Sequence, residues 1–255
     1  MASKRISSSD RRAAILLVAR KVFAEHGYDG ARTQQIAAAA GVSDTLVFRH
    51  FKSKQGLYRE VLDDLVAEQD ASFKKTSVPK ASTQSLLEAI WEYLNDCVHS
   101  SPRRAEATRI LIANMAGDGV YARLMFKRAN RLLDRPVRNA LAAADASGDL
   151  DAGRVDSING SHFIAHVGAI ISISRASRPA VVPYRGDDTA LLRDAFRFCM
   201  RGFGVRDEIV QRFERSKGIV DDDVPPATLI PRRARRNSAR VGSRPRRRGD
   251  TGTAV

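Results

Sequence analysis

The side chains best suited to contact a charged partner gather in one stretch of this 255-residue sequence, from Thr33 to Lys54. Its second half, DTLVFRHFKSK, mixes acidic, hydroxyl, aromatic and basic groups over about three helical turns. Hydroxyl, imidazole, guanidinium and ammonium groups all donate hydrogen bonds, so this surface suits an anionic partner rich in acceptors, such as a nucleic acid. We expect the outward-facing members to be Asp44, Thr45, Phe48, Arg49 and His50, followed by Lys52 and Lys54.

Two short helices joined by a tight corner would hold these side chains in place. Thr33 can open a first helix with its body at 34–40, and Gly41 follows where a left-handed C-cap favours a residue without Cβ. Ser43 then stands at the N-cap of a second helix over 44–51. A helix-turn-helix with a polar, basic outer face has the shape that enters a DNA major groove; the alternative is an ordinary corner of a helical bundle. The apolar residues that would pin the two helices are Ile36, Ala37, Ala40, Val42, Val47 and Phe51.

The run IAAAAGVSDTLVFRHFKSKQGLY resembles the DNA-binding signature of the TetR family of one-component transcriptional regulators, over roughly residues 10–62. At Phe48 the sequence departs from the family, which usually has tyrosine there. A phenol would reach a phosphate, whereas Phe48 can pack only against a sugar or a thymine methyl group. The positions that match the family pattern are Ile36, Ala37, Ala40, Gly41, Val42, Ser43, Val47, Phe48, Phe51, Ser53, Lys54 and Leu57.

The chemistry of each side chain suggests a role on DNA. Arg49 and His50 are candidate donors to a base edge or a phosphate, and Asp44 could accept from a cytosine amino group or shape the helix N-terminus. The family resemblance implies that Gln34 and Thr45 also face the DNA. The sequence leaves open which of these groups reads a base. Candidate phosphate contacts are Thr33, Ser43 and Lys54.

The composition agrees with a polyanionic partner. The formal net charge is +14, and residues 232–248 alone carry nine arginines and no acid. We interpret this tail as a solvated segment with incidental DNA affinity, an arm for non-specific DNA binding, or an attachment to anionic lipid or RNA. The two cysteines, Cys97 and Cys199, have no metal-ligand spacing, and the polar N-terminus has no apolar core of a signal peptide. We therefore expect a reducing, cytoplasmic location.

Helical periodicity predominates and no segment alternates with period two, so the sequence predicts an all-α fold. This fold would combine an N-terminal three-helix helix-turn-helix domain with a C-terminal helical domain for ligand binding and dimerisation. Pro136 should kink or split the helical segment over 119–146. The predicted parts are a disordered basic arm (1–9), the DNA-binding domain (10–54), a connecting helix (55–75), the effector-binding and dimerisation domain (83–215) and a disordered arginine-rich tail (224–255).

The most apolar predicted helix spans residues 155–177, with no charged residue between Ser157 and Ser174. A transmembrane span is the alternative interpretation, but the Ser, Asn and His side chains early in the helix favour a buried one. Its small residues, such as Gly160 and Gly168, would let another helix approach closely. The family resemblance implies that this helix and the one at 189–201 pair with their copies in a homodimer, which would present two recognition helices to a near-palindromic operator in double-stranded DNA.

The resemblance also implies a cavity for a largely apolar small-molecule effector within the second domain. His162 and His166 stand four residues apart, which could suit a metal, but no third ligand lies nearby in sequence. We expect no metal and no cofactor. Residues of this domain that could line the cavity, or pack in the core, are Trp91, Tyr93, Cys97, Met125, Phe126 and His162.

These features favour a cytoplasmic, homodimeric, effector-responsive regulator, most simply a repressor released from its operator by a small molecule. The rival is an architectural, nucleoid-type protein that coats DNA without an effector. An enzyme finds no support, because the sequence offers no Gly-rich phosphate loop, no paired carboxylates and no nucleophile elbow.

Overall fold

The computed structural model describes residues 7–75, 78, 80–177 and 179–219, and every regular element in them is an α-helix. The prediction of an all-α fold is confirmed. The tail at 224–255 and residues 1–6 of the expected arm lie outside the described residues. The helices are α1 (Ser8–Gly30), α2 (Thr33–Ala39), α3 (Asp44–His50), α4 (Lys54–Lys75), α5 (Thr83–Val98), α6 (Pro102–Ala116), α7 (Val120–Ala146), α8 (Ser157–Ala176), α9 (Asp188–Gly202) and α10 (Asp207–Ser216).

Helix α1 begins earlier than the sequence suggested, inside the segment expected to be a disordered arm. The Ser7 side chain accepts from the backbone N–H of Asp10 at 3.1 Å and so caps the helix N-terminus. Near its other end Gly27 has φ +68° and ψ 180°, so the helical backbone is interrupted there before Gly30. Only glycine adopts this conformation freely, which explains why the break falls at this position.

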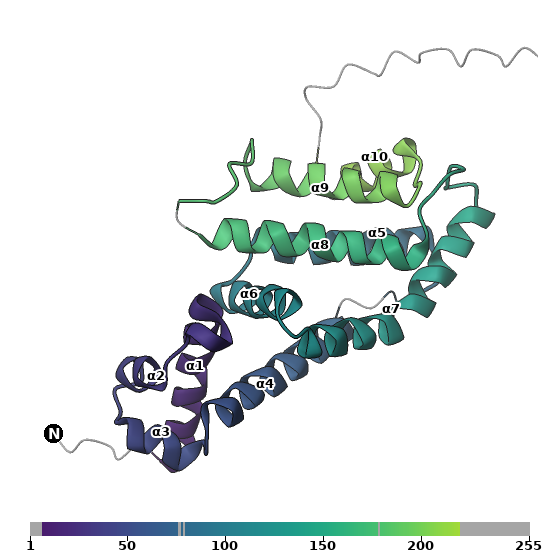
Figure 1. Ribbon diagram of the computed structural model, residues 1–255. Coiled ribbons are helices and arrows are strands. Elements are labelled where there is room, and N and C mark those ends of the chain that lie inside the picture. Colours follow the sequence, from purple (N-terminus) through teal and green to yellow (C-terminus); the bar gives the residue numbers. More distant parts are fainter. Residues whose placement is uncertain (1–6, 76–77, 79, 178, 220–255) are drawn as a thin grey trace, which may run out of the picture. The chain divides into compact units, whose positions relative to one another are not determined.

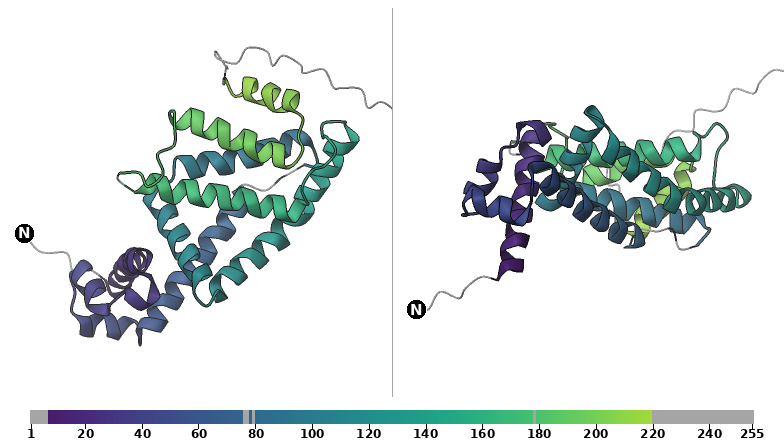
Figure 2. Two further views of the ribbon diagram at one scale, coloured as in Figure 1. Left: turned by 45° about the horizontal axis from the view of Figure 1, so that its top comes forward. Right: turned by 60° about the horizontal axis from the view of Figure 1, so that its bottom comes forward.

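The first apolar core joins α1, α2, α3 and α4. Ile15 and Phe23 of α1 pack with Ile36, Val47 and Leu57, all of them buried. Figure 2 shows α2 and α3 beside α1, where this core lies. This core also includes residues from the part expected to form the second domain (83–215), because α6 packs on α1. Buried residues from that part that belong to this core are Ile110, Tyr121 and Met125.

The second apolar core lies among α5, α7, α8, α9 and α10. Leu94 of α5 and Phe196 and Met200 of α9 are fully buried in it. Helices α8 and α9 lie side by side in Figure 1, with α5 against them. Pro136 does not split α7, which is one helix from Val120 to Ala146.

Two glycines of α8 allow close packing within the chain. A Cβ on Gly160 would lie 2.3 Å from the Phe203 ring, and one on Gly168 would lie 2.6 Å from the Tyr93 ring and 2.8 Å from Cys97 Sγ. The sequence correctly indicated that small residues on this helix admit a neighbour. At these two positions the neighbours are α5 and the end of α9 in the same chain.

Candidate nucleic-acid interface and internal cavity

The corner between α2 and α3 is a Schellman turn built around Gly41. The Val42 N–H donates to Ala37 O at 3.0 Å and the Gly41 N–H donates to Ala38 O at 3.1 Å. Gly41 has φ +64°, in the left-handed region that disfavours residues with a Cβ. This turn ends α2 sharply and fixes the direction in which α3 starts.

Helix α3 is capped as the sequence predicted. The Ser43 side chain accepts from the Leu46 N–H at 3.2 Å. One face of α3 is pinned to the first core, since Val47 and Phe51 are buried. Thr45, Phe48 and Arg49 lie three and four residues apart on the opposite face, and all three are exposed.

The ten predicted DNA contacts all lie at least partly on the surface. Four are half-buried, at the edges of the exposed face or beside neighbouring helices: Thr33, Asp44, His50 and Lys54. The other six are exposed: Gln34, Ser43, Thr45, Phe48, Arg49 and Lys52. Phe48 is the apolar member, with 44% of its surface exposed.

Local contacts help to assign roles to Asp44 and to the adjacent glutamines Gln34 and Gln35. One carboxylate oxygen of Asp44 is buried with no hydrogen-bond partner in the described residues, in the first turn of α3. A negative charge there interacts favourably with the helix dipole, so this position favours shaping the helix N-terminus over reading a cytosine. Gln34 and Gln35 are both exposed, and the side-chain oxygen of Gln35 accepts from the Arg32 N–H at 2.8 Å.

Lys54, at the start of α4, has partners within the protein. Its Nζ donates to Asp29 O at 3.2 Å and lies 4.7 Å from the centre of the Tyr28 ring. An ammonium group has three donors, so two remain for another acceptor. The Lys54 ammonium group is thus held close to the loop before α2 and keeps donors for a phosphate contact.

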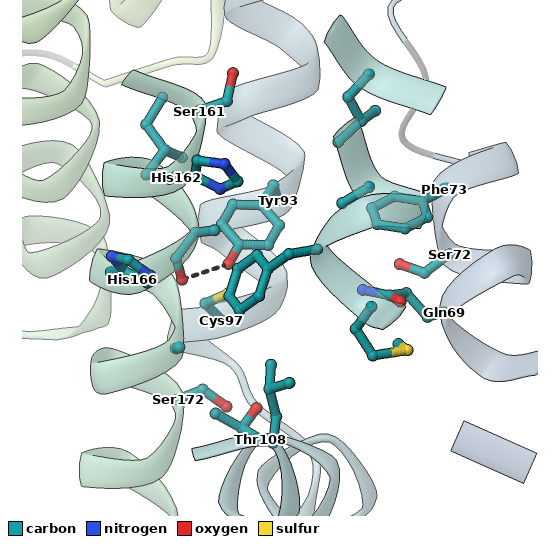
Figure 3. Close-up of a pocket in the computed structure, with 18 of the residues that line it drawn as sticks. Gln69, Ser72, Phe73, Tyr93, Cys97, Thr108, Ser161, His162, His166 and Ser172 are labelled. Carbon is teal, nitrogen blue, oxygen red and sulfur yellow. Dashed lines mark hydrogen bonds between the residues drawn. The ribbon is translucent and has the colours of Figure 1, made fainter. Parts of the chain in front are cut away.

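A cavity of about 940 Å³ lies among α4, α5, α6, α7 and α8. Figure 3 shows Gln69, Ser72 and Phe73 of α4 facing His162 and His166 of α8 across it. Five of the six residues that we expected in the cavity or the core line it: Tyr93, Cys97, Met125, Phe126 and His162.

Trp91 is the exception: of the two alternatives, cavity lining or core, the structure places it in the core. It is buried in the second core with its ring 5.2 Å from Phe196 and 5.9 Å from Phe213, centre to centre, and does not line the cavity. Tyr93 lies two residues further along α5, which rotates it by about 200° to the cavity side. Helical periodicity identified the helix but not which face meets the cavity.

The α5 wall of the cavity is held in place by hydrogen bonding and close packing. The Tyr93 hydroxyl donates to Ala165 O at 3.1 Å, the bond drawn in Figure 3, and Gly168 leaves room for the Tyr93 ring. Burial raises the pKa of Tyr93 well above its usual value and also raises the pKa of the Cys97 thiol. Both groups therefore stay protonated and neutral near pH 7.

The two histidines of α8 contact an aromatic ring. The Phe126 ring centre lies 5.4 Å from that of His162 and 6.0 Å from that of His166, both edge-on. No group of three His, Cys, Asp or Glu side chains that could hold a metal occurs in the part of the chain that the structure describes.

Several cavity residues were missed by the sequence interpretation, which treated residues 55–75 as a connector. Helix α4 is itself one wall, and α6 contributes another. No motif marks these positions, because they are brought together only by packing between helices distant in sequence. The missed residues include Leu65, Glu68, Gln69, Ser72, Phe73, Arg103, Arg104 and Thr108.

A buried arginine connects α1 to the cavity wall. Arg20 is 2% exposed, and its Nη1 donates to both carboxylate oxygens of Glu68 at 2.8 Å. Its Nε lies 3.2 Å from Glu106 of α6, and Arg103 lies 3.2 Å from Asp64 of α4. Glu68 and Arg103 also line the cavity, so one ionic cluster joins α1 to the cavity wall.

The outer surfaces of α8 and α9 carry exposed aromatic residues. Phe163 is 56% exposed and Phe198 is 67% exposed. The Val155 N–H donates to Gly202 O at 3.2 Å, which ties the start of α8 to the end of α9. None of the described helices, α8 included, combines the length and apolar character of a membrane span.

Comparison with known proteins agrees with this geometry. The sequence model of bacterial regulatory proteins of the tetR family matches residues 15–61. The HTH-type transcriptional regulator RutR of Escherichia coli K12 is 30% identical over 195 residues, covering 74% of this chain and 84% of RutR. The HTH-type transcriptional activator FasR of Mycolicibacterium smegmatis is 32% identical over 94 residues, covering 35% of this chain and 43% of FasR. The chain thus spans less than half of FasR.

A solved structure supports the fold. A bacterial regulatory protein of the tetR family from Rhodococcus RHA1 matches with a TM-score of 0.59 at 18% identity, covering 79% of this chain and all of that one.

Proposed function

Since this chain belongs to the TetR family of bacterial regulatory proteins, we propose that it is a sequence-specific DNA-binding repressor that a small-molecule effector releases from its operator. In this proposal the protein is cytoplasmic and homodimeric and has no enzymatic activity. The observation that carries the DNA-binding part is the exposed face of α3. Thr45, Phe48 and Arg49 project from a short helix whose start is fixed by the Gly41 turn and the Ser43 cap. A rigid helix with an exposed polar and basic face suits insertion into a major groove.

Two copies of the chain are needed to recognise a DNA site selectively. One helix of seven residues contacts too few base pairs to select a site in a chromosome. The exposed rings of Phe163 and Phe198 give α8 and α9 an apolar surface that a second copy would bury. Two-fold symmetry then presents both α3 helices to one near-palindromic site.

The cavity is the place for the effector. Its walls include α4, the helix that leads directly from the DNA-binding helices, and α6, which packs on α1. Through Glu68 and Arg103, a ligand in the cavity would change the surroundings of Arg20 on α1. An effector that fits best when α1 and α4 are displaced would lower the population of the DNA-binding state.

Footprinting of the purified protein on chromosomal DNA tests this proposal. We expect a small number of discrete sites, each with two half-sites separated by about one helical turn or a multiple of it. Broad coverage that disappears with modest salt would instead favour an architectural protein that coats DNA. The genes beside the discrete sites would then indicate which compounds to test as effectors.

A further inference from the structure

The cavity wall near the start of α6 carries a guanidinium group with weak partners. Arg104 lines the cavity, and 28% of its side chain is exposed. Its Nη2 donates to Cys97 Sγ at 3.3 Å, its Nη1 lies 3.7 Å from Asp96, and its Cζ lies 5.5 Å from the centre of the Tyr93 ring. A guanidinium has five N–H donors, and a sulfur atom is a poor acceptor for one of them.

The two cavity-side neighbours of Arg104 supply no negative charge. Burial raises the pKa of the Cys97 thiol and of the Tyr93 phenol, so both keep their protons near pH 7. Asp96, the nearest carboxylate, does not line the cavity. On the cavity side the positive charge of Arg104 is therefore not neutralised.

The acidic side chains and Arg103 on the cavity wall each have an ion-pair partner, although Asp134 Oδ1 has no hydrogen-bond partner in the described residues. Glu68 contacts Arg20 at 2.8 Å, and Asp134 contacts Arg138 at 2.8 Å. Arg103 lies 3.2 Å from Asp64 and also contacts Glu68. Among these wall residues, Arg104 is the one whose nearest opposite charge lies beyond hydrogen-bonding distance.

The rest of the wall is mostly apolar. Leu111, Ile112, Phe126, Leu133 and Val137 are typical members. The volume of about 940 Å³ is near the upper end of the usual range for ligand pockets, about 300–1,000 Å³. A ligand that fills this space must have a long or bulky apolar body.

We propose that the cavity binds an amphipathic monoanion, with its apolar body in the cavity and a carboxylate-type head group accepting hydrogen bonds from Arg104. This inference rests on the proposed role of the cavity as the effector site. The hydrogen bond from Tyr93 to Ala165 and the close contact at Gly168 fix the Tyr93 ring, whose centre lies 5.5 Å from Arg104 Cζ, so this side of the head-group site is in place before the ligand arrives. The planar fork of arginine matches a carboxylate with two parallel hydrogen bonds.

Three probes of equal chain length test the head-group preference: decanoate, decanol and decylamine, each titrated into the full-length protein by displacement of the neutral dye Nile red. We expect decanoate to bind about tenfold or more tightly than decanol, because a charge-assisted hydrogen bond is added, and decylamine to bind least well. Arg104→Met should remove the preference for decanoate over decanol. Arg109→Met is the matched control, since Arg109 lies on the same helix, donates to Ser177 and does not line the cavity, and it should keep the preference.

Two further variants keep the test decisive if Arg104→Met folds poorly. Asp96→Asn removes the carboxylate that competes for Arg104, so it should tighten decanoate binding and leave decanol unchanged. Arg104→Lys should retain part of the preference. Equal binding of decanoate and decanol, strongest binding of decylamine, a preference that survives Arg104→Met, or no binding of any probe would each overturn the inference.

The regulator function is judged separately, by operator binding without any probe. Discrete operator binding with no preference for decanoate would refute the ligand class alone. An Arg104-dependent preference in a protein that shows no discrete operator would refute the proposed function and leave the anion site standing.

Discussion

At the scale of single residues, the proposed DNA-reading surface consists of a few side chains whose environments differ sharply. Arg49 is exposed on the outer face of α3, whereas the ammonium of Lys54 is held over the Tyr28 ring and against Asp29 O. A charge that the protein itself positions is well suited to a sequence-independent contact, because its location does not depend on the base pairs present.

Lys54→Ala should therefore weaken binding to all DNA sequences by a similar factor. We expect the slope of log affinity against log salt concentration to decrease by about one unit, as for the loss of one phosphate contact. Fluorescence anisotropy titrations at several salt concentrations, on operator and on unrelated DNA, measure both effects. An unchanged slope would show that Lys54 does not contact DNA.

Gly41 is required because of its backbone conformation. Gly41→Ala should destabilise the fold by about 1–2 kcal/mol, since an alanine is strained at φ +64° although no atom lies within 4 Å of its Cβ. Gly41→Asn should cost less, because asparagine tolerates the left-handed region. Urea unfolding monitored by circular dichroism measures both variants. Equal stability of Gly41→Ala and the unaltered protein would contradict the strain argument.

Gly168→Ala should destabilise the protein by about 1–3 kcal/mol through overpacking, because its Cβ would lie 2.6 Å from the Tyr93 ring. The combination Gly168→Ala with Tyr93→Leu should recover part of the loss. The same urea unfolding assay applies, and a Gly168→Ala protein that unfolds at the unaltered urea concentration would show that the two helices adjust freely.

At the scale of helices, the ionic cluster around Arg20 links α1, α4 and α6. Arg20→Met should destabilise the protein by about 3 kcal/mol, the low end for breaking a buried ion pair, because Glu68 is still 33% exposed. Differential scanning calorimetry and urea unfolding measure the loss. Arg20→Met combined with Glu68→Gln should lose less than Arg20→Met alone, and strictly additive losses would show that the two residues do not interact.

The helices themselves could be predicted from the sequence to a large extent. Thr33, Gly41 and Ser43 are local signals, and they placed α2 and α3 within a residue of their observed ends. The faces of the helices were harder to predict, as the burial of Trp91 against Phe196 shows. Contacts of α6 with α1, and the use of α4 as a cavity wall, join positions far apart in sequence, and periodicity within one helix contains no information about them.

At the scale of the whole molecule, the proposed function makes selective DNA binding depend on dimerisation through α8 and α9. Phe198→Asp places a charge on the exposed apolar surface and should shift the protein toward monomers in analytical ultracentrifugation. Operator affinity should decrease to the level of unrelated DNA. Val120→Asp is the matched control, because Val120 is 63% exposed on α7 and should not affect assembly. A Phe198→Asp protein that stays dimeric would place the interface elsewhere.

The arginine-rich segment at 224–255 should add affinity for DNA without adding selectivity. Deleting it should reduce binding to unrelated DNA and leave the ratio of operator to unrelated binding the same or higher. Parallel titrations of the two DNAs measure this ratio. Loss of the folded state on deletion would instead show that the tail is structural.

The central claim is that the exposed face of α3 reads DNA. Operator affinity of a variant with Thr45, Phe48 and Arg49 all changed to alanine tests it most directly, with circular dichroism to confirm an unchanged helix content. We predict that this variant binds operator and unrelated DNA equally weakly while remaining folded and dimeric. A folded variant that still discriminates the operator from unrelated DNA would contradict the account.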